Sequence, residues 1–186
     1  MIFAPIFQSK VNVIHGFTGR VDSRGQRLDL GSTASVSDWA RVTHDLGVQD
    51  WGVARVSQVH GNGVLWADGP GAVGEADAVI TDKRGLLIAV RTADCVPILV
   101  EGNGLVAAIH AGWRGLAAGV IPAAIEQMGP PGNLSAVVGP SICCDCYEVG
   151  EEVVSGISKW IDSDAFVDRT RSRPHVDGGK AAVAQL

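Results

Sequence analysis

The apolar positions of the chain recur mostly at the short spacing of β-strands, and several apolar runs are uninterrupted. Uninterrupted runs are typical of strands that other layers cover on both faces. A glycine-rich turn at Gly61–Gly63 predicts that residues 52–58 and 64–67 pair as a hairpin. Residues 69–74, rich in Gly and Pro, are predicted to form a loop. Strands are predicted at residues 11–17, 52–58, 64–67, 77–81, 86–91, 96–101, 105–110 and 134–138.

Three other segments have the apolar spacing of helices, with three or four residues between apolar positions. Pro122 either opens the regular part of the second helix or kinks it. Beyond Asp162 the polar, glycine-rich sequence supports no assignment. The predicted helices run from a cap at Ser35 or Ser37 to a stop at Gly47, over Gly115–Met128, and over Glu151–Ile161.

Composition and charge favour one globular unit with small or neutral partners. The chain has 186 residues and 46% hydrophobic content, which fits a single domain spanning residues 1–186. Its net charge of −5 and scattered Lys and Arg provide no basic surface for nucleic acid. No apolar run is long enough to span a membrane and no signal peptide follows Met1, so we expect a cytoplasmic protein. Three of its four cysteines fall within 143–146, unlike a disulfide framework, so we expect reduced thiols.

Three metal-capable side chains occur where an apolar run meets a turn. They are His60 in QVHG (58–61), Cys95 in TADC (92–95) and His110 in HAGWRG (110–115). Two imidazoles and a thiolate form the three-ligand set of a catalytic zinc, with the fourth position open. Their separations of 35 and 15 residues are too long for a local zinc knuckle, so only the fold can bring them together.

Simpler interpretations of these residues stay open at this point. A histidine at a strand end is more often packed or hydrogen-bonded than a ligand, and a cysteine is most often a small buried residue. The carboxylate of Asp94 raises the pKa of the adjacent Cys95 thiol unless a metal offsets it. Arg114 is either a surface residue beside an aromatic side chain or a clamp for phosphate at a helix start. A second metal site at Cys143, Cys144 and Cys146 is disfavoured, because consecutive ligands fit tetrahedral geometry poorly.

The motifs QVHG, ADAVITD, TADCVPIL, HAGWRG, GPSI and CYEVG, read in order over about residues 15–152, resemble the YfiH family. This family is also known as the laccase-domain or polyphenol oxidoreductase family. The resemblance implies an α/β (α+β) fold of mixed β-sheets flanked by helices, and a metal, usually zinc, on His60, Cys95 and His110. It also implies that Cys146, which matches CYEVG, faces the core. Family chains usually continue beyond the segment at 177–186 and carry SLNLG where this chain has RLDLG at 27–31, so one wall of the pocket is expected to be missing.

The resulting hypothesis is a monomeric, zinc-dependent enzyme that acts on purine nucleosides with phosphate. Family members resemble purine nucleoside phosphorylases, which cleave adenosine or inosine and also deaminate adenosine, and the expected catalytic residues here are Cys95, His110 and Arg114. One alternative is a Cu²⁺-dependent polyphenol oxidase, because two histidines and a cysteine also form a blue-copper set. Another is a cysteine or zinc hydrolase of a cell-wall precursor, with Cys95 as nucleophile and His110 as base. A fourth is a binding protein without catalysis.

Overall fold

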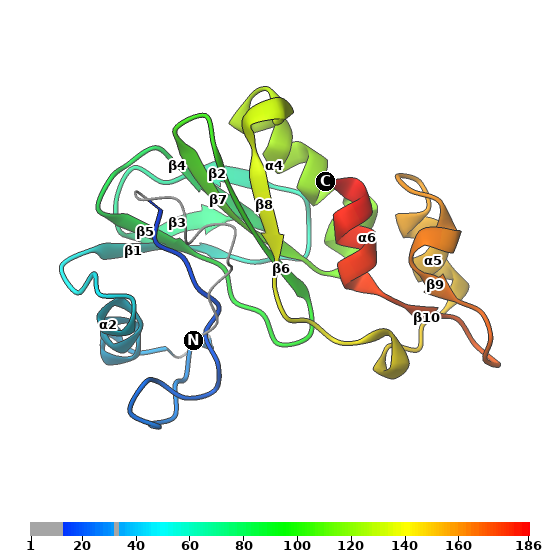
Figure 1. Cartoon of the computed structure of the whole chain (residues 1–186), viewed down its shortest axis with the longest axis horizontal. Helices are drawn as coiled ribbons and strands as arrows, with labels where there is room; N and C mark the ends of the chain where they lie inside the picture. Colours follow the sequence, from blue (N-terminus) through cyan, green and yellow to red (C-terminus); the bar gives the residue numbers. More distant parts are fainter. Residues whose placement is uncertain (1–12, 32–33) are drawn as a thin grey trace.

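The computed structural model describes residues 13–31 and 34–186, and its centre is a five-stranded mixed sheet (Figure 1). β2 runs parallel to β4, and all other neighbouring strands are antiparallel. Gly102–Gly104 turns β6 into β7, and all three residues have positive φ, including Asn103 at 53°. The strand order is β2 (Val64–Trp66), β4 (Ala78–Thr81), β7 (Leu105–Ala111), β6 (Val96–Gly102) and β8 (Ser135–Val138).

A second, three-stranded parallel sheet covers one face of the first. Its order is β3 (Gly71–Glu75), β1 (Gly52–Ser57) and β5 (Leu86–Ala89). Ala54 and Val56 of β1 pack in one cluster with Val79 and Ala108 of the larger sheet. The predicted hairpin is therefore wrong, because β1 pairs with β3 and β5, whereas β2 pairs with β4 in the other sheet. The predicted loop at 69–74 is also wrong, because it contains most of β3.

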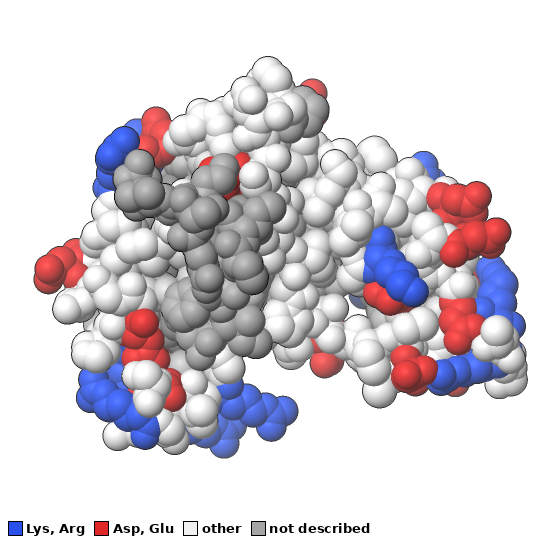
Figure 2. Space-filling model, in the orientation of Figure 1, with Lys and Arg blue, Asp and Glu red and all other residues white. Residues whose placement is uncertain are grey.

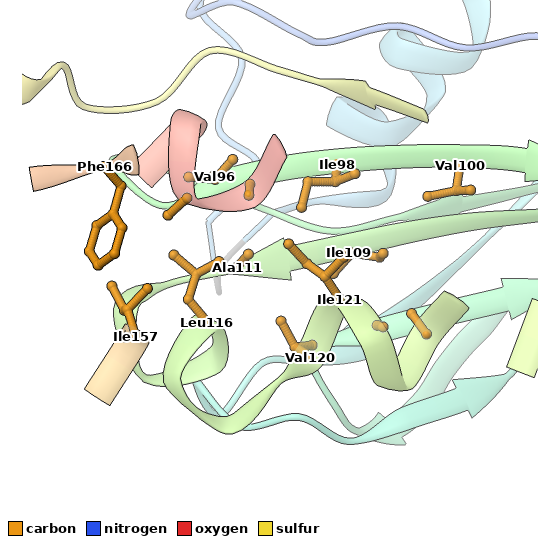
Figure 3. Packing of buried hydrophobic residues seen from close by; sticks show 14 of the residues in the cluster. Val96, Ile98, Val100, Ile109, Ala111, Leu116, Val120, Ile121, Ile157 and Phe166 are labelled. Carbon is orange, nitrogen blue, oxygen red and sulfur yellow. The ribbon is translucent and has the colours of Figure 1, made fainter. Parts of the chain in front are cut away.

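Helices cover the opposite face of the five-stranded sheet, where the main core lies. Figure 3 shows Ile98 and Ile109 of the sheet facing Val120 and Ile121 of a helix, with Phe166 at one end of the cluster. The covering helices are α3 (Trp113–Ala118), α4 (Val120–Met128) and α6 (Gly178–Gln185), and α5 (Glu151–Ile157) packs against α3. Mixed sheets flanked by helices confirm the α/β fold.

The helix predicted at 115–128 is two helices, α3 and α4, which meet at Gly119. Gly119 has φ of 78°, in the left-handed region that favours glycine. A Cβ there would lie 2.3 Å from the ring of Trp160, which donates a hydrogen bond from Nε1 to the carbonyl of Ala117 at 3.0 Å. The break therefore comes from close packing. Pro122 is the third residue of α4, where its missing N–H is not needed.

The two other helix predictions agree with the structure better than the strand predicted at residues 11–17 does. α2 (Val36–Asp45) begins with Ser35 as N-cap, and Gly47 follows it in the left-handed region, both as predicted. α5 ends at Ile157, four residues before the predicted Ile161. Residues 13–17 form no strand beyond an isolated bridge, and residues 11 and 12 lie outside the described part.

The remaining elements are short. Beyond the last predicted helix, where no element was predicted, β9 (Val167–Asp168) and β10 (His175–Val176) form an antiparallel pair and α6 follows. None of the helices in the described ranges is both long and apolar enough to cross a membrane. The remaining short elements are η1 (Pro131–Asn133), η2 (Cys144–Cys146) and η3 (Ser163–Ala165).

Candidate metal centre

The fold brings together the three side chains that the motifs singled out. One donor atom each from His60, Cys95 and His110 lies within 4.8 Å of the others. Cys95 Sγ is 3.9 Å from His60 Nε2, and the two imidazole rings meet edge to face with centroids 4.8 Å apart. Cys95 precedes β6 and His110 lies near the end of β7, and the antiparallel pairing of these strands brings both to one edge of the sheet. His60 arrives from the other sheet, in the loop after β1.

A buried carboxylate, Asp77, holds the group in place. Its Oδ1 accepts a hydrogen bond from His110 Nδ1 at 2.8 Å. The same carboxylate accepts backbone N–H bonds from Val59, His60 and Gly61 at 3.3, 3.0 and 2.7 Å. Asp77 therefore positions two of the three donor side chains, one through its ring and one through its loop. Asp77 was not among the predicted site residues, although a carboxylate between two alanines at the start of an apolar strand is a signal for such a role.

The loop that carries His60 has an unusual backbone conformation. His60 has φ of 60°, in the left-handed region that few residues other than glycine adopt. Such conformations cost free energy and persist where the surroundings fix them. Here three hydrogen bonds from backbone N–H groups to the Asp77 carboxylate fix the loop. The backbone strain therefore serves to direct the imidazole toward Cys95 and His110.

Glycine at position 112 allows the donor group to pack against the start of α3. A Cβ on Gly112 would lie 2.9 Å from His60 Cδ2 and 3.0 Å from Cys95 Sγ. A Cβ on Gly115, one helical turn later, would lie 3.1 Å from the carbonyl oxygen of Gly61. Both glycines of the HAGWRG motif are thus required by close approach.

The electrostatics of the group suit metal ligation. Burial lowers the pKa of His110, so the imidazole is neutral at neutral pH. Its Nδ1–H then donates to Asp77, which leaves Nε2 free to bind a metal. Burial raises the pKa of the Cys95 thiol, and the charges of Asp94 and Asp77 raise it further. A metal would offset this effect, because it binds the thiolate.

An apolar cavity of about 240 Å³ adjoins the donor group. Cys95 lines the cavity as well as belonging to the donor group. Trp113 and Tyr147 provide its aromatic walls, and Tyr147 was not predicted as a site residue. Burial raises the pKa of Tyr147, and the nearby guanidinium of Arg114 opposes that rise. The apolar lining consists of Val96, Ala111, Leu116, Ile142, Ile157 and Val176.

Arg114 does not line the cavity but lies directly beside it. The side chain is exposed, in the first turn of α3, and its guanidinium carbon lies 4.4 Å from the ring centroid of Trp113. The structure therefore shows the first interpretation of Arg114, a surface residue stacked on an aromatic side chain that forms the cavity wall, while the phosphate clamp stays a prediction. On the face drawn in Figure 2, positive and negative side chains are intermixed and form no extended basic area.

The cysteines at 143–146 form no comparable group. Cys143 and Cys146 are exposed and Cys144 is half-buried, so the expectation that Cys146 faces the core is wrong. The short helix η2 turns Cys146 outward, and its neighbour Tyr147 packs against the core instead. Within the described ranges, only His60, Cys95 and His110 form a group of three metal-capable side chains.

Known proteins resemble this chain in both sequence and structure. A curated purine nucleoside phosphorylase of Streptomyces coelicolor, SCO2081, is 40% identical over 152 residues, which cover 76% of this chain and 62% of the relative. Adenosine deaminase RL5, from an unknown prokaryotic organism, is 46% identical over 89 residues, covering 45% of this chain and 34% of the relative. The crystal structure of YlmD from Geobacillus stearothermophilus has a TM-score of 0.77 at 26% identity, covering 92% of this chain and 73% of YlmD.

The curated relatives are matched over only part of their own length, whereas the family match covers most of this chain. This chain spans less than two thirds of the length of either curated relative. Residues 32–186 match the family described as multi-copper polyphenol oxidoreductase laccase. Because this match covers most of the sequence, the chain belongs to the multi-copper polyphenol oxidoreductase laccase family, the YfiH family that its motifs resemble.

Proposed function

We propose that His60, Cys95 and His110 bind one zinc ion and that the site acts on purine nucleosides, by phosphorolysis of adenosine or inosine and by deamination of adenosine. One observation carries the proposal. Cys95 belongs to both the donor group and the apolar cavity, so a molecule in the cavity would lie beside the metal. The names of the two curated relatives, a purine nucleoside phosphorylase and an adenosine deaminase, support this choice of substrate.

The donor set fits zinc. Two imidazoles and one thiolate would occupy three of the four positions around a tetrahedral zinc. The fourth position would be open to water, whose pKa zinc lowers to about 7, or to a substrate oxygen, which zinc polarises. Ligands of a tetrahedral zinc lie roughly 3.3–3.6 Å apart, so the 4.8 Å group needs only a small closure. By accepting a hydrogen bond from Nδ1–H, Asp77 keeps the His110 proton on Nδ1, so that Nε2 is unprotonated and able to bind the metal.

The cavity suits a flat, mostly apolar ring. Its volume of about 240 Å³ is below the roughly 300–1,000 Å³ of pockets that enclose drug-sized ligands, so it accommodates a base and leaves a sugar nearer the opening. Trp113 and Tyr147 offer ring faces for stacking. The Tyr147 hydroxyl, whose pKa burial raises further above neutral pH, is protonated and can donate a hydrogen bond to a nitrogen of the base.

Arg114 is proposed to hold the phosphate that phosphorolysis requires. Its planar guanidinium matches phosphate oxygens, and stacking on Trp113 limits the positions that the side chain can take. The effect of its charge on the pKa of Tyr147 supports a position near the cavity wall. The chemistry assigned to Arg114 is therefore charge stabilisation, while His110 and Cys95 act as ligands.

The alternatives lack support from particular atoms. A blue-copper site adds a weak axial methionine, but Met128 is buried in the main core at the end of α4 and Met1 lies outside the described residues. A cysteine nucleophile needs a base within about 3 Å and a thiolate. The pKa of the Cys95 thiol, the nucleophile of that alternative, is raised, which opposes formation of the free thiolate, and His110, its base, is hydrogen-bonded through Nδ1 to Asp77.

The proposal is tested by incubating zinc-loaded protein with adenosine, with and without phosphate, and separating the bases and nucleosides by chromatography. Adenine is expected only with phosphate, and inosine in either case. Cys95→Ala should abolish both products, whereas Cys144→Ala, the matched control, should leave both rates near those of the unchanged protein. If none of adenine, inosine and hypoxanthine forms above the Cys95→Ala background, the nucleoside proposal fails.

Arg114→Ala separates the anion role from the nucleoside role. We expect the KM for phosphate to rise by about tenfold to a hundredfold, as for a lost charge-assisted contact. Deamination, which uses no phosphate, should change much less. An equal loss of both activities would show that Arg114 has no specific role toward phosphate.

A further inference from the structure

Outside the candidate metal centre, two exposed cysteines lie at the ends of one tight turn. Cys143 and Cys146 are separated by Cys144 and Asp145, the C-x-x-C spacing of redox-active cysteine pairs. Neither thiol belongs to the group formed by His60, Cys95 and His110. The turn is the small yellow coil at the lower edge of the molecule in Figure 1.

The backbone places these two cysteines at a distance that a disulfide can bridge. The N–H of Cys146 donates to the carbonyl of Cys143 at 3.0 Å, which closes the turn. The first and last Cα atoms of such a turn lie less than about 7 Å apart, and disulfides join Cα atoms about 4.4–6.8 Å apart. The two side chains lie close enough to interact, because the contact with Cys143 is the largest cause that raises the pKa of the Cys146 thiol.

The third cysteine of the turn is in a different environment. Cys144 is half-buried, and burial together with the carboxylates of Asp177 and Asp168 raises the pKa of its thiol. Its thiol therefore lies within the electrostatic influence of the carboxylates of β9 and of the start of α6. A bond between Cys144 and Cys143, its neighbour in sequence, also requires a strained geometry. Cys143 and Cys146 thus differ from Cys144 in that both of their side chains are exposed to solvent.

The turn adjoins the wall of the cavity. Ile142 precedes the pair and Tyr147 follows it, and both residues line the cavity. Ile142 N–H donates to the carbonyl of Asp94 at 3.0 Å, beside Cys95, and Val176 N–H donates to the carbonyl of Tyr147 at 3.0 Å. The cysteine pair is therefore an exposed part of a segment whose two ends are anchored at the site.

We propose that Cys143 and Cys146 are a redox modification site that forms a reversible intramolecular disulfide by exchange with a low-mass disulfide. One cysteine thiolate attacks a sulfur of the small disulfide, breaks its S–S bond and releases one small thiol, which takes up the proton that the cysteine lost. The second cysteine, as thiolate, attacks the resulting mixed disulfide and releases the second small thiol. The protein dithiol loses two electrons and two protons, and the small disulfide gains them.

Zinc-loaded full-length protein equilibrated with mixtures of reduced and oxidised glutathione tests the proposal. Free thiols are then blocked with iodoacetamide, and peptides are mapped by mass spectrometry. The expected product is a peptide with one Cys143–Cys146 disulfide. Cys95 and Cys144 should form no disulfide and should be recovered as thiols or as their alkylated forms. Dithiothreitol should reverse the bond. Cys144→Ser should retain the cross-link, and Cys143→Ser and Cys146→Ser should each abolish it and accumulate the glutathione adduct on the remaining cysteine instead.

Two results would overturn the proposal. One is a protein that carries only glutathione adducts on Cys143 and Cys146 at every ratio, which would show that the two sulfurs do not close. The other is a cross-link that persists in Cys143→Ser or Cys146→Ser, which would place the bond elsewhere. Circular dichroism of each variant establishes that the fold is intact, so a missing cross-link cannot be attributed to unfolding.

Discussion

The two cysteine-containing regions of this protein differ in how their side chains are brought together. The donor group takes His60, Cys95 and His110 from three separate segments, and Asp77 fixes two of these residues. The turn at Cys143–Cys146 holds its cysteines within one short segment, and two of the three are exposed. Closeness in sequence thus places two cysteines together at the surface, whereas the candidate metal centre depends on a buried carboxylate that orients its donor side chains.

Replacing Asp77 with Asn should have the largest effect on this comparison. The variant keeps the shape but presents an NH₂ group where several N–H donors converge, and so leaves buried donors unsatisfied. We expect the free energy of unfolding to fall by about 2–4 kcal/mol and zinc affinity to fall about 10–100-fold. Urea unfolding and chelator competition measure the two quantities.

Asp82→Asn is the matched control for that variant. Asp82 is an exposed carboxylate paired with Lys83, so its replacement should change unfolding by less than about 1 kcal/mol. If Asp77→Asn behaves like this control, Asp77 does not organise the centre.

Gly112→Ala should weaken zinc binding with a smaller effect on folding. The new Cβ would lie 2.9 Å from His60 Cδ2 and 3.0 Å from Cys95 Sγ, so both side chains must move. We expect a loss of affinity of about tenfold, as for ligands displaced from their preferred geometry. Gly69→Ala, where a Cβ has nothing within 4 Å, is the control. Equal zinc affinities in the two variants would argue against a tight donor group.

Zinc binding should release about one proton at neutral pH. The raised pKa of Cys95 keeps the metal-free thiol protonated, and the lowered pKa of His110 means that this ring has already lost its proton. The apparent affinity should therefore rise roughly tenfold per pH unit between about pH 7 and 8. Calorimetry in buffers of different ionisation enthalpy measures the proton count. Zinc binding that releases no proton would show that Cys95 is not a ligand.

The smallest effect is expected at the cysteine turn. Replacing Cys143, Cys144 and Cys146 together with serine should leave zinc stoichiometry near that of the unchanged protein, because none of them belongs to the donor group. Metal analysis of the purified variant provides the measurement. Complete loss of zinc from a folded triple variant would reverse the comparison between the two regions.

The sequence predicted the local features of this fold better than its long-range pairing. Ser35 and Gly47 mark helix ends through their own backbone chemistry, so both were predicted correctly. The parallel pairing of β1 with β3 and β5 joins strands that are distant in sequence, and no turn residue records it. The glycine turn after β1 indicated a hairpin, but it carries the chain from one sheet to the other.

The site shows the same division. His60, Cys95 and His110 were identifiable because each side chain sits where a strand meets a turn, a position with a clear sequence pattern. Asp77 was missed because its role depends on three amides and a ring that only the tertiary structure brings near it. The exposure of Cys146 depends likewise on how a short turn lies on the core.

X-ray absorption at the zinc edge of the purified, zinc-loaded protein tests the central claim most directly. The account predicts one sulfur at about 2.3 Å together with nitrogen ligands at about 2.0–2.1 Å, from Cys95, His60 and His110 respectively. A first shell without sulfur would remove Cys95 from the centre. A shell of two or three sulfurs would place the metal at the turn containing Cys143, Cys144 and Cys146, and would contradict the account.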